Sequence, residues 1–153
     1  MEKIVIASDH AGFDFKGKMI AFLKKKGFEV KDLGTYSAER CDYPQYSYAL
    51  AKEIASRRYK RGILVCKSGI GHSIAANRLP GVRAALCYNV KAAVLSREHN
   101  DSNVLVMGSA FVSLPLAKKI TAAWLSTEFQ GGRHQKRLNL IKEIEKQIGA
   151  KER

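Results

Sequence analysis

Short apolar runs alternate along the chain with longer stretches in which apolar residues recur at helical spacing. The runs lie at residues 3–7, 28–33, 63–65, 82–86 and 104–107. They are mainly apolar, except that apolar and polar residues alternate in the run at 28–33. Runs of this length and composition are typical of strands buried in a parallel sheet. The pattern therefore predicts five strands.

Helical periodicity fills the segments between these runs. Phe15, Met19 and Leu23 repeat at i, i+4 until Gly27 ends the pattern, which predicts a helix over 13–26. Residues 34–45, with Gly34, Asp42 and Pro44, are predicted to form a long loop. Further helices are predicted at residues 46–54, from the glycine loop at 66–71 to Pro80, at 89–99, and from Pro115 through Trp124.

The alternation of strands and helices predicts right-handed βαβ units. The expected fold class is α/β, a Rossmann-like doubly wound sheet of five parallel strands in a three-layer α/β/α arrangement. At 153 residues the chain is expected to form a single domain over 1–153. Ligands of such folds bind beyond the carboxyl ends of the strands.

An extra C-terminal helix, at about residues 130–150, is predicted after the sheet is complete. Gly131 and Gly132 break the chain before it, and an apolar stripe follows at Leu138, Ile141, Ile144 and Ile148. The stripe needs a surface to cover, either on its own domain or on a second copy of the chain. We prefer the second copy, which predicts a homo-oligomer.

The loop Cys66-Lys67-Ser68-Gly69-Ile70-Gly71 joins the third strand to a helix start. Backbone N–H groups at such a junction favour a negative charge. The Gly-Lys-Ser/Thr ending of a nucleotide P-loop is missing, and Ile74 stands where a dinucleotide fingerprint needs glycine, so no cofactor is expected. Cys66 is expected to have a lowered thiol pKa because of the helix dipole and Lys67. The alternative is a buried structural cysteine beside a tight turn.

A net charge of +13 makes nucleic acid one candidate partner. The dense basic runs 24–26 and 57–61 lie at predicted helix ends without interleaved aromatic residues, which favours a small anionic substrate instead. Arg133 and Arg137 share one face at the start of the last helix. Cations there oppose the helix dipole unless an anion lies between them, which indicates a phosphate.

Three cysteines, no signal-peptide pattern and no apolar run near about 18 residues predict a reduced, cytoplasmic protein with no membrane partner. Cys41, Cys66 and Cys87 are too widely spaced for a zinc site, so no metal is expected. His10, His99 and His134 adjoin polar or glycine-rich segments and are candidates for chemistry or binding.

Several motifs together resemble type B ribose-5-phosphate isomerase and the wider sugar-phosphate isomerase family that includes the galactose-6-phosphate isomerase subunits. The motifs are Ser8-Asp9-His10-Ala11-Gly12, Asp42-Tyr43-Pro44, Cys66 to Gly71 with Ser73-Ile74-Ala75-Ala76-Asn77, Ser96-Arg97-Glu98-His99-Asn100-Asp101, and Gly131-Gly132-Arg133-His134-Gln135-Lys136-Arg137. They span nearly the whole chain.

The resemblance implies interconversion of ribose 5-phosphate and ribulose 5-phosphate, in the pentose phosphate pathway, without metal or cofactor. Cys66 is implied as the base that moves a proton between C2 and C1, and His99 as the residue that opens the sugar ring. Ser68 and the amides of Gly69 to Gly71 are implied to hold the enediolate. The implied substrate-binding residues are Asp9 and Asn100 for the hydroxyls, His10, Arg133, His134 and Arg137 for the phosphate, and Lys67 and Ile70 in the glycine loop.

The family builds its site between two subunits, which implies a homodimer or a dimer of dimers with shared active sites. Three residues depart from the family pattern: Lys67 replaces a usual glycine, Ala110 an arginine near the phosphate, and His72 a glutamate base of one branch. Two other readings stay open. One is an isomerase of a six-carbon sugar phosphate, such as allose 6-phosphate or galactose 6-phosphate; the other is a non-catalytic module that binds anions or nucleic acid.

Overall fold

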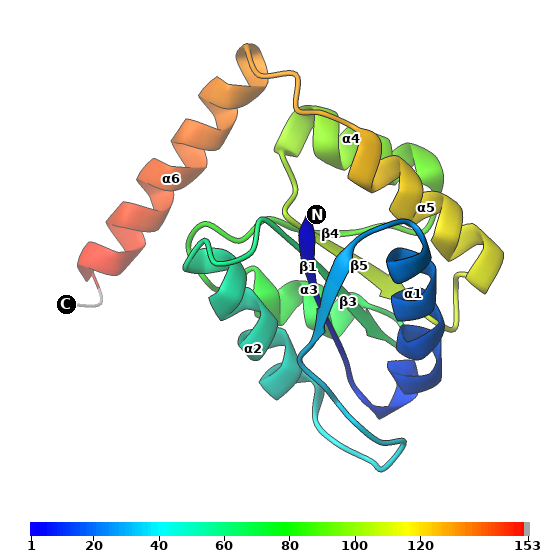
Figure 1. Ribbon diagram of the computed structural model, residues 1–153. Coiled ribbons are helices and arrows are strands. Elements are labelled where there is room, and N and C mark those ends of the chain that lie inside the picture. Colours follow the sequence, from blue (N-terminus) through cyan, green and yellow to red (C-terminus); the bar gives the residue numbers. More distant parts are fainter. Residues whose placement is uncertain (152–153) are drawn as a thin grey trace.

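The computed structural model describes residues 1–151 and contains a wholly parallel five-stranded sheet (Figure 1). The strands stand in the spatial order β2-β1-β3-β5-β4. Their bounds are β1 (Lys3–Ser8), β2 (Glu29–Asp32), β3 (Arg61–Cys66), β4 (Ala84–Leu86) and β5 (Val104–Gly108). The five predicted strands are confirmed, although β4 begins two residues later than predicted.

Within these residues the chain forms a short 3-10 turn, η1 (His10–Gly12), and six α-helices. The helices are α1 (Phe13–Lys25), α2 (Tyr43–Ala55), α3 (Ile70–Ala76), α4 (Val90–Asn100), α5 (Leu114–Ser126) and α6 (Arg133–Lys151). Three helix boundaries differ from the prediction by about three residues or more, including the start of α6, which was predicted at about residue 130. α2 begins inside the predicted loop because Pro44 suits a first helical turn, and α3 ends at Ala76 rather than at Pro80.

The sheet lies between two helical layers, as Figure 1 shows. Side chains of successive strand residues point to opposite faces. Ile4 and Ile6 of β1 pack with α1, α4 and α5, whereas Val5 and Ala7 pack with α2 and α3. The three-layer α/β/α prediction is therefore confirmed.

The topology brings the carboxyl ends of three strands together. β1 and β3 are neighbours within the sheet. β2 lies on the far side of β1, whereas β5 and β4 lie on the far side of β3, so the strand order changes direction between β1 and β3. Ser8 pairs with Val65, and Cys66 pairs with Gly108. The loops after β1, β3 and β5 therefore meet at the crevice where open α/β sheets bind ligands.

β4 is an edge strand whose outer side is closed by a side chain. Ala84 donates its N–H to Asn77 Oδ1 at 2.8 Å, and Asn77 Nδ2 donates to the carbonyl of Ala84 at 2.9 Å. The asparagine amide thus pairs with the strand as a neighbouring backbone would. This contact also explains why α3 ends at Ala76, since the next residue turns toward β4.

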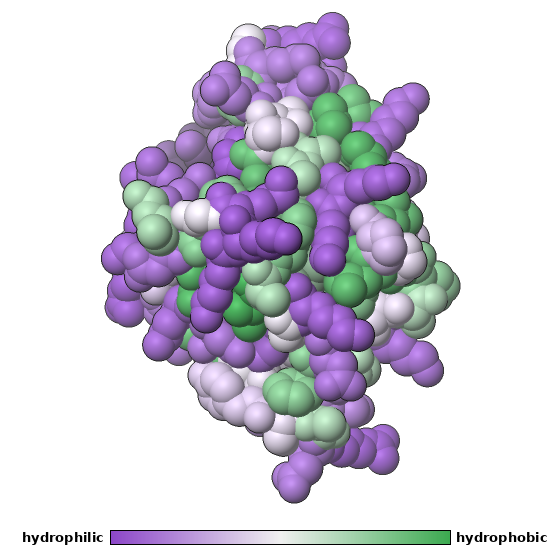
Figure 2. Space-filling view, turned by 45° about the vertical axis from the view of Figure 1, so that its right-hand side comes forward, coloured by the Kyte–Doolittle hydropathy of each residue, from purple (hydrophilic) through white to green (hydrophobic). Residues whose placement is uncertain are grey.

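α6 extends away from the rest of the molecule (Figure 1). Leu138 is buried, but further along the helix large apolar side chains are 45% to 56% exposed, namely Leu140, Ile141, Ile144 and Ile148. Figure 2 shows another part of the surface, where hydrophilic side chains predominate and apolar ones gather in patches. Most of the predicted stripe is thus left uncovered by its own chain.

No helix within the described residues is both long enough and apolar enough to cross a membrane.

Candidate active site

The crevice at the carboxyl end of the sheet is formed by the loops after β1, β3 and β5. Ser109 N donates to Cys66 O at 2.8 Å and Ala110 N to Lys67 O at 2.9 Å, so the last two loops are joined by backbone hydrogen bonds. Asp9 caps η1 by accepting the Gly12 N–H at 3.1 Å and is only 8% exposed. One acidic side chain is thereby held beside the glycine loop.

Two glycines allow the glycine loop its shape, Gly69 within it and Gly108 at the end of the neighbouring strand β5. Gly69 has φ +85°, and a Cβ there would lie 2.5 Å from Leu86 Cδ1. A Cβ on Gly108 would collide with the backbone of Ser68. Lys67, in contrast, is not among the residues with positive φ, so its side chain is accommodated without strain at a place where the family usually has glycine.

Cys66 lies at the end of β3 with 5% of its surface exposed. Burial raises the pKa of its thiol, the Gly69 N–H that donates to Sγ at 3.1 Å lowers it, and the Asp9 carboxylate raises it again. The expected lowering of the pKa is therefore wrong for the chain by itself, because desolvation outweighs the backbone donors. The Lys67 side chain, expected to contribute, is exposed.

The expected cradle of three amides is partly occupied by side chains of the loop. The N–H of Gly69 donates to Cys66 Sγ, and the N–H of Ile70 donates to Ser68 Oγ at 3.2 Å. Among the described residues, the N–H of Gly71 has no partner. Since Ser68 Oγ accepts, its own hydroxyl hydrogen is free to donate into the crevice.

His10 connects the crevice to the loop before α2. Its Nδ1 lies 3.2 Å from the backbone N–H of Cys41, which makes Nδ1 the acceptor and assigns the proton of a neutral ring to Nε2. Cys41 Sγ is 3.9 Å from the same nitrogen. The imidazole is thus held in one orientation at the end of β1.

His72 is buried within the molecule and does not face the crevice as a free base. Its Nδ1 is 2.5 Å from Ser47 Oγ and its Nε2 is 3.1 Å from Val65 O. Burial lowers its pKa to about 4, so the ring is neutral at pH 7. The carbonyl can only accept, which assigns the proton to Nε2 and makes Ser47 the donor to Nδ1. Both nitrogens are therefore engaged.

The glycine loop is supported by two tyrosines that were not singled out from the sequence. Tyr88 donates its hydroxyl to Ser68 O at 2.9 Å, and the Tyr43 ring packs against Gly71 and edge-on against His72 at 5.8 Å. Tyr43 lies in a motif of the resemblance, so a signal for it existed. Tyr88 lies in no motif, and only the tertiary structure brings it to the loop.

The remaining predicted residues gather around the ends of α4 and α6. His99 and Asn100 end α4, and the His99 ring stacks on His134 at 4.2 Å between centroids. Burial lowers the pKa of His134, and His99, Arg133 and Arg137 lower it further. Cationic groups that repel one another in this way would be stabilised by an anion between them.

The structure separates these two groups of residues. β5 begins at Val104, just after α4, and ends at Gly108 beside Cys66. Four residue steps along a strand span about 13 Å, so His99 and Cys66 lie at opposite ends of the sheet. One chain thus carries a half-site at the carboxyl end, with Cys66, Ser68, Asp9 and His10, and another at the amino end, with His99, Asn100, Arg133, His134 and Arg137.

Within residues 1–151 no three His, Cys, Asp or Glu side chains are grouped so that they could hold a metal ion.

Comparisons with known proteins agree with this geometry. The ribose/galactose isomerase family model matches residues 4–141. Ribose-5-phosphate isomerase B of Escherichia coli is 48% identical, over 95% of this chain and 97% of that protein. The Clostridium thermocellum ribose-5-phosphate isomerase B structure is 49% identical, with a TM-score of 0.94 and coverage of 95% of this chain and 99% of that one.

A Mycoplasma genitalium ribose-5-phosphate isomerase B structure, with bound ribulose-5-phosphate, is 40% identical and has a TM-score of 0.90. The match covers 94% of this chain and 96% of the Mycoplasma genitalium chain. These matches extend over both half-sites and confirm the resemblance seen in the motifs. The chain therefore belongs to the ribose/galactose isomerase family.

Proposed function

We propose that this chain interconverts ribose 5-phosphate and ribulose 5-phosphate, a reaction of the pentose phosphate pathway. The observation that carries the proposal is the crevice in which Cys66 Sγ stands beside Ser68 and Asp9, in a chain similar over its length to ribose-5-phosphate isomerases. A base next to a hydroxyl donor suits proton transfer at a carbon adjacent to a carbonyl.

Each residue has one role in the proposed reaction. His99 opens the furanose ring, after which the Cys66 thiolate removes the C2 proton and an enediolate forms. The Ser68 hydroxyl and the Gly71 N–H donate to the enediolate oxygens, the proton of the C2 hydroxyl passes to O1, and the thiol returns the proton taken from C2 to C1. Asp9 and Asn100 hold sugar hydroxyls, while His10, Arg133, His134 and Arg137 surround the phosphate.

The proposed active site is shared between two chains. Support comes from the positions of the half-sites at opposite ends of the sheet, so that residues of one chain are too far apart to hold one pentose phosphate. Their charges are complementary, with Asp9 in one half and Arg133 and Arg137 in the other. Two chains paired by a twofold axis would complete two sites.

α6 supplies the surface for this pairing in our proposal. Its exposed apolar residues continue from a groove of about 390 Å³ beside β4, which is lined by Val82, Ala85, Leu138 and Ile141. We expect a homodimer or a dimer of dimers in which α6 packs on the partner. The proposed location is the cytoplasm, supported by Cys41, Cys66 and Cys87, which are all free thiols.

Turnover measurements with two substrates test the proposal. Purified protein should convert ribose 5-phosphate to ribulose 5-phosphate, followed by absorbance of the ketose, with a higher kcat/KM than for allose 6-phosphate. A higher kcat/KM for allose 6-phosphate would select the six-carbon reading. If neither sugar phosphate reacts while polynucleotides bind with a steep salt dependence, the binding-module reading replaces catalysis.

Arg137→Ala is expected to raise KM for ribose 5-phosphate by about 10- to 100-fold and to change kcat less than about threefold. Charge-assisted hydrogen bonds to a phosphate contribute equally before and during proton transfer, so their loss weakens uniform binding. Steady-state kinetics measures both constants. Lys136→Ala, the neighbouring exposed cation, is the matched control. A large fall in kcat at unchanged KM would contradict the phosphate role.

The pH dependence of kcat/KM is expected to follow the Cys66 thiolate. Because the thiol pKa is raised from 9.0, the reactive thiolate is the minor form at neutral pH, and its fraction grows about tenfold per pH unit. We expect kcat/KM to rise between about pH 6 and 8 without levelling off. A plateau below neutrality would show that the pKa is lowered instead.

A further inference from the structure

A cavity of about 610 Å³ lies at the amino end of the sheet, opposite the crevice with Cys66. It lies between the ends of α2 and α4, the start of β3, the 80–83 turn and Lys142 of α6. Its volume falls in the range of small-molecule sites. None of its lining residues belongs to either half of the proposed active site.

The lining carries a large surplus of positive charge. Among the described residues that line the cavity, Asp101 alone carries a carboxylate. The lining cations are Arg57, Lys60, Arg61, Arg83, Arg97 and Lys142. Six cations against one carboxylate leave a surplus of five, and Glu2, 3.6 Å from Arg61 Nε, reduces it to four.

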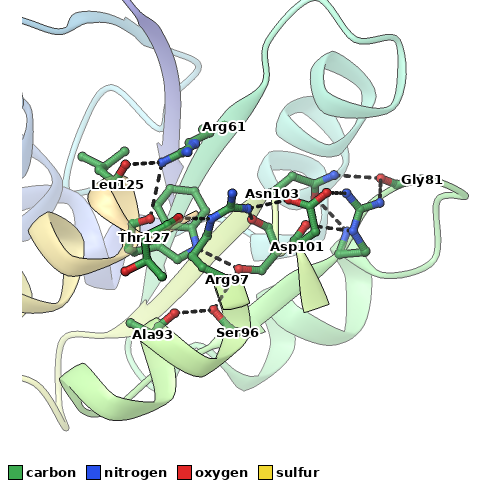
Figure 3. A network of polar contacts seen from close by, with 12 residues as sticks. Arg61, Gly81, Ala93, Ser96, Arg97, Asp101, Asn103, Leu125 and Thr127 are labelled. Carbon is green, nitrogen blue, oxygen red and sulfur yellow. Dashed lines mark hydrogen bonds and ion pairs between the residues drawn. The ribbon is translucent and has the colours of Figure 1, made fainter. Parts of the chain in front are cut away.

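Much of this charge is fixed in place by a polar network (Figure 3). Asp101 accepts from Arg97 at 2.9 Å and from Arg83 at 3.4 Å, so one carboxylate serves two guanidinium groups. Arg97 also donates to the Thr127 carbonyl at 3.1 Å, and Arg61 donates to the Leu125 carbonyl at 2.7 Å. Carbonyls at the end of α5 orient these cations but carry only partial charge.

Two observations indicate that the cations are not fully neutralised. The Arg97 side chain is only 8% exposed, and its Nη2 makes no hydrogen bond to the described part of the chain, which leaves this atom to solvent. The pKa of Arg61 is lowered, first by burial and then by repulsion from Arg97. An anion in the cavity would supply the missing partner and relieve this repulsion.

We propose that this cavity binds a small ligand that carries two or more phosphoryl groups. A single phosphate brings about −1.5 to −2 charges at neutral pH and would leave roughly half of the surplus in place. Two phosphoryl groups bring about twice as much, or about −3 to −4, and would neutralise most of a surplus of four to five. Several arginines in fixed orientations suit bidentate contacts to phosphoryl oxygens.

Arg57 makes the proposal testable without harm to the fold. Its φ is +62°, in the left-handed region that favours glycine, so Arg57→Gly relaxes the backbone while removing a lining cation. We expect this variant to unfold at a temperature about 2 °C higher than the unchanged protein. Lost ligand binding in this variant could not be assigned to misfolding.

Calorimetric titration with inorganic phosphate, pyrophosphate and ADP is the test. Pyrophosphate should bind at least about tenfold more tightly than phosphate, and Arg57→Gly with Lys60→Ser should weaken it about tenfold or more. Lys24→Ser with Lys25→Ser removes the same charge from the exposed end of α1 and should change the affinity less than about twofold.

Comparison of ADP with pyrophosphate distinguishes the source of the phosphoryl groups. Tighter binding of ADP than of pyrophosphate identifies a nucleotide, and equal binding identifies the phosphoryl groups alone; both support the site. Equal affinities for phosphate and pyrophosphate overturn the proposal. An equal loss in both double variants also overturns it, since the binding would then be diffuse attraction to a basic surface.

Discussion

Cys66→Ala is expected to lower kcat for ribose 5-phosphate by about 10²- to 10⁴-fold, the usual cost of removing a general base. The thiol stands at the end of β3 in the same crevice as Ser68 Oγ and Gly71 N, two donors that can hold an enediolate. No other side chain of that half-site combines a titratable group with this position. Initial rates of ketose formation measure the effect.

Cys87→Ala is the matched control, because Cys87 is equally buried but packs in the core among α4 and α5 residues. Burial raises the pKa of its thiol to about 11, so it stays protonated. We expect its kcat to change less than about threefold. Alkylation at Cys66 should accordingly inactivate the unchanged protein and Cys87→Ala, and substrate should protect Cys66. Mass spectrometry distinguishes this modification from alkylation of Cys41, which is a free and more exposed thiol.

His72→Asn tests the rival base. Its two ring nitrogens are engaged by Ser47 and Val65, so we expect less than about a tenfold fall in kcat and a lower melting temperature from the disturbed buried contacts. A fall in kcat of about 10²-fold or more for His72→Asn, with Cys66→Ala still active, would transfer the role of base to His72.

Mixing two inactive variants should restore activity to about a quarter of that of the unchanged protein. Cys66→Ala lacks the base of the carboxyl-end half-site, and Arg137→Ala, assayed at low substrate, lacks phosphate binding in the amino-end half-site. Random exchange makes half of all dimers hybrid, and each hybrid has one site with both halves intact.

The control for this experiment is a mixture of Cys66→Ala with Ser68→Ala, since both changes lie in the same half-site. That mixture should stay inactive, because every site then contains one altered carboxyl-end half. Exchange is verified with one chain carrying an affinity tag. Recovery in neither mixture despite exchange would show that each active site is built from a single chain.

Most of the fold could be predicted because strand and helix periodicity is a local property. Each predicted strand exists, and the helix from residue 13 ends within one residue of its predicted end. The start of α2 was missed because Pro44 reads equally as a loop residue and as a first-turn residue. The insertion of β5 between β3 and β4 depends on tertiary packing and has no local signal.

The site was predictable in its residues more than in its electrostatics. The glycine loop and the Arg133–Arg137 pair were recognisable from spacing alone. The sign of the Cys66 pKa shift was not, because it depends on burial in the tertiary structure and on the Asp9 carboxylate, which follows another strand. The resemblance implied a site shared between two subunits, but spacing alone did not show that one chain holds His99 and Cys66 at opposite ends of its sheet.

The pairing of Asn77 with Ala84 has a consequence for how this molecule can associate. An open edge strand is a template on which another chain can add a strand, the first step of domain swapping and fibre growth. Here one side-chain amide occupies both backbone groups of Ala84, the first residue of a strand only three residues long. Growth by sheet extension is hindered at this end of β4, which favours contacts between copies of the chain through helices such as the uncovered apolar face of α6.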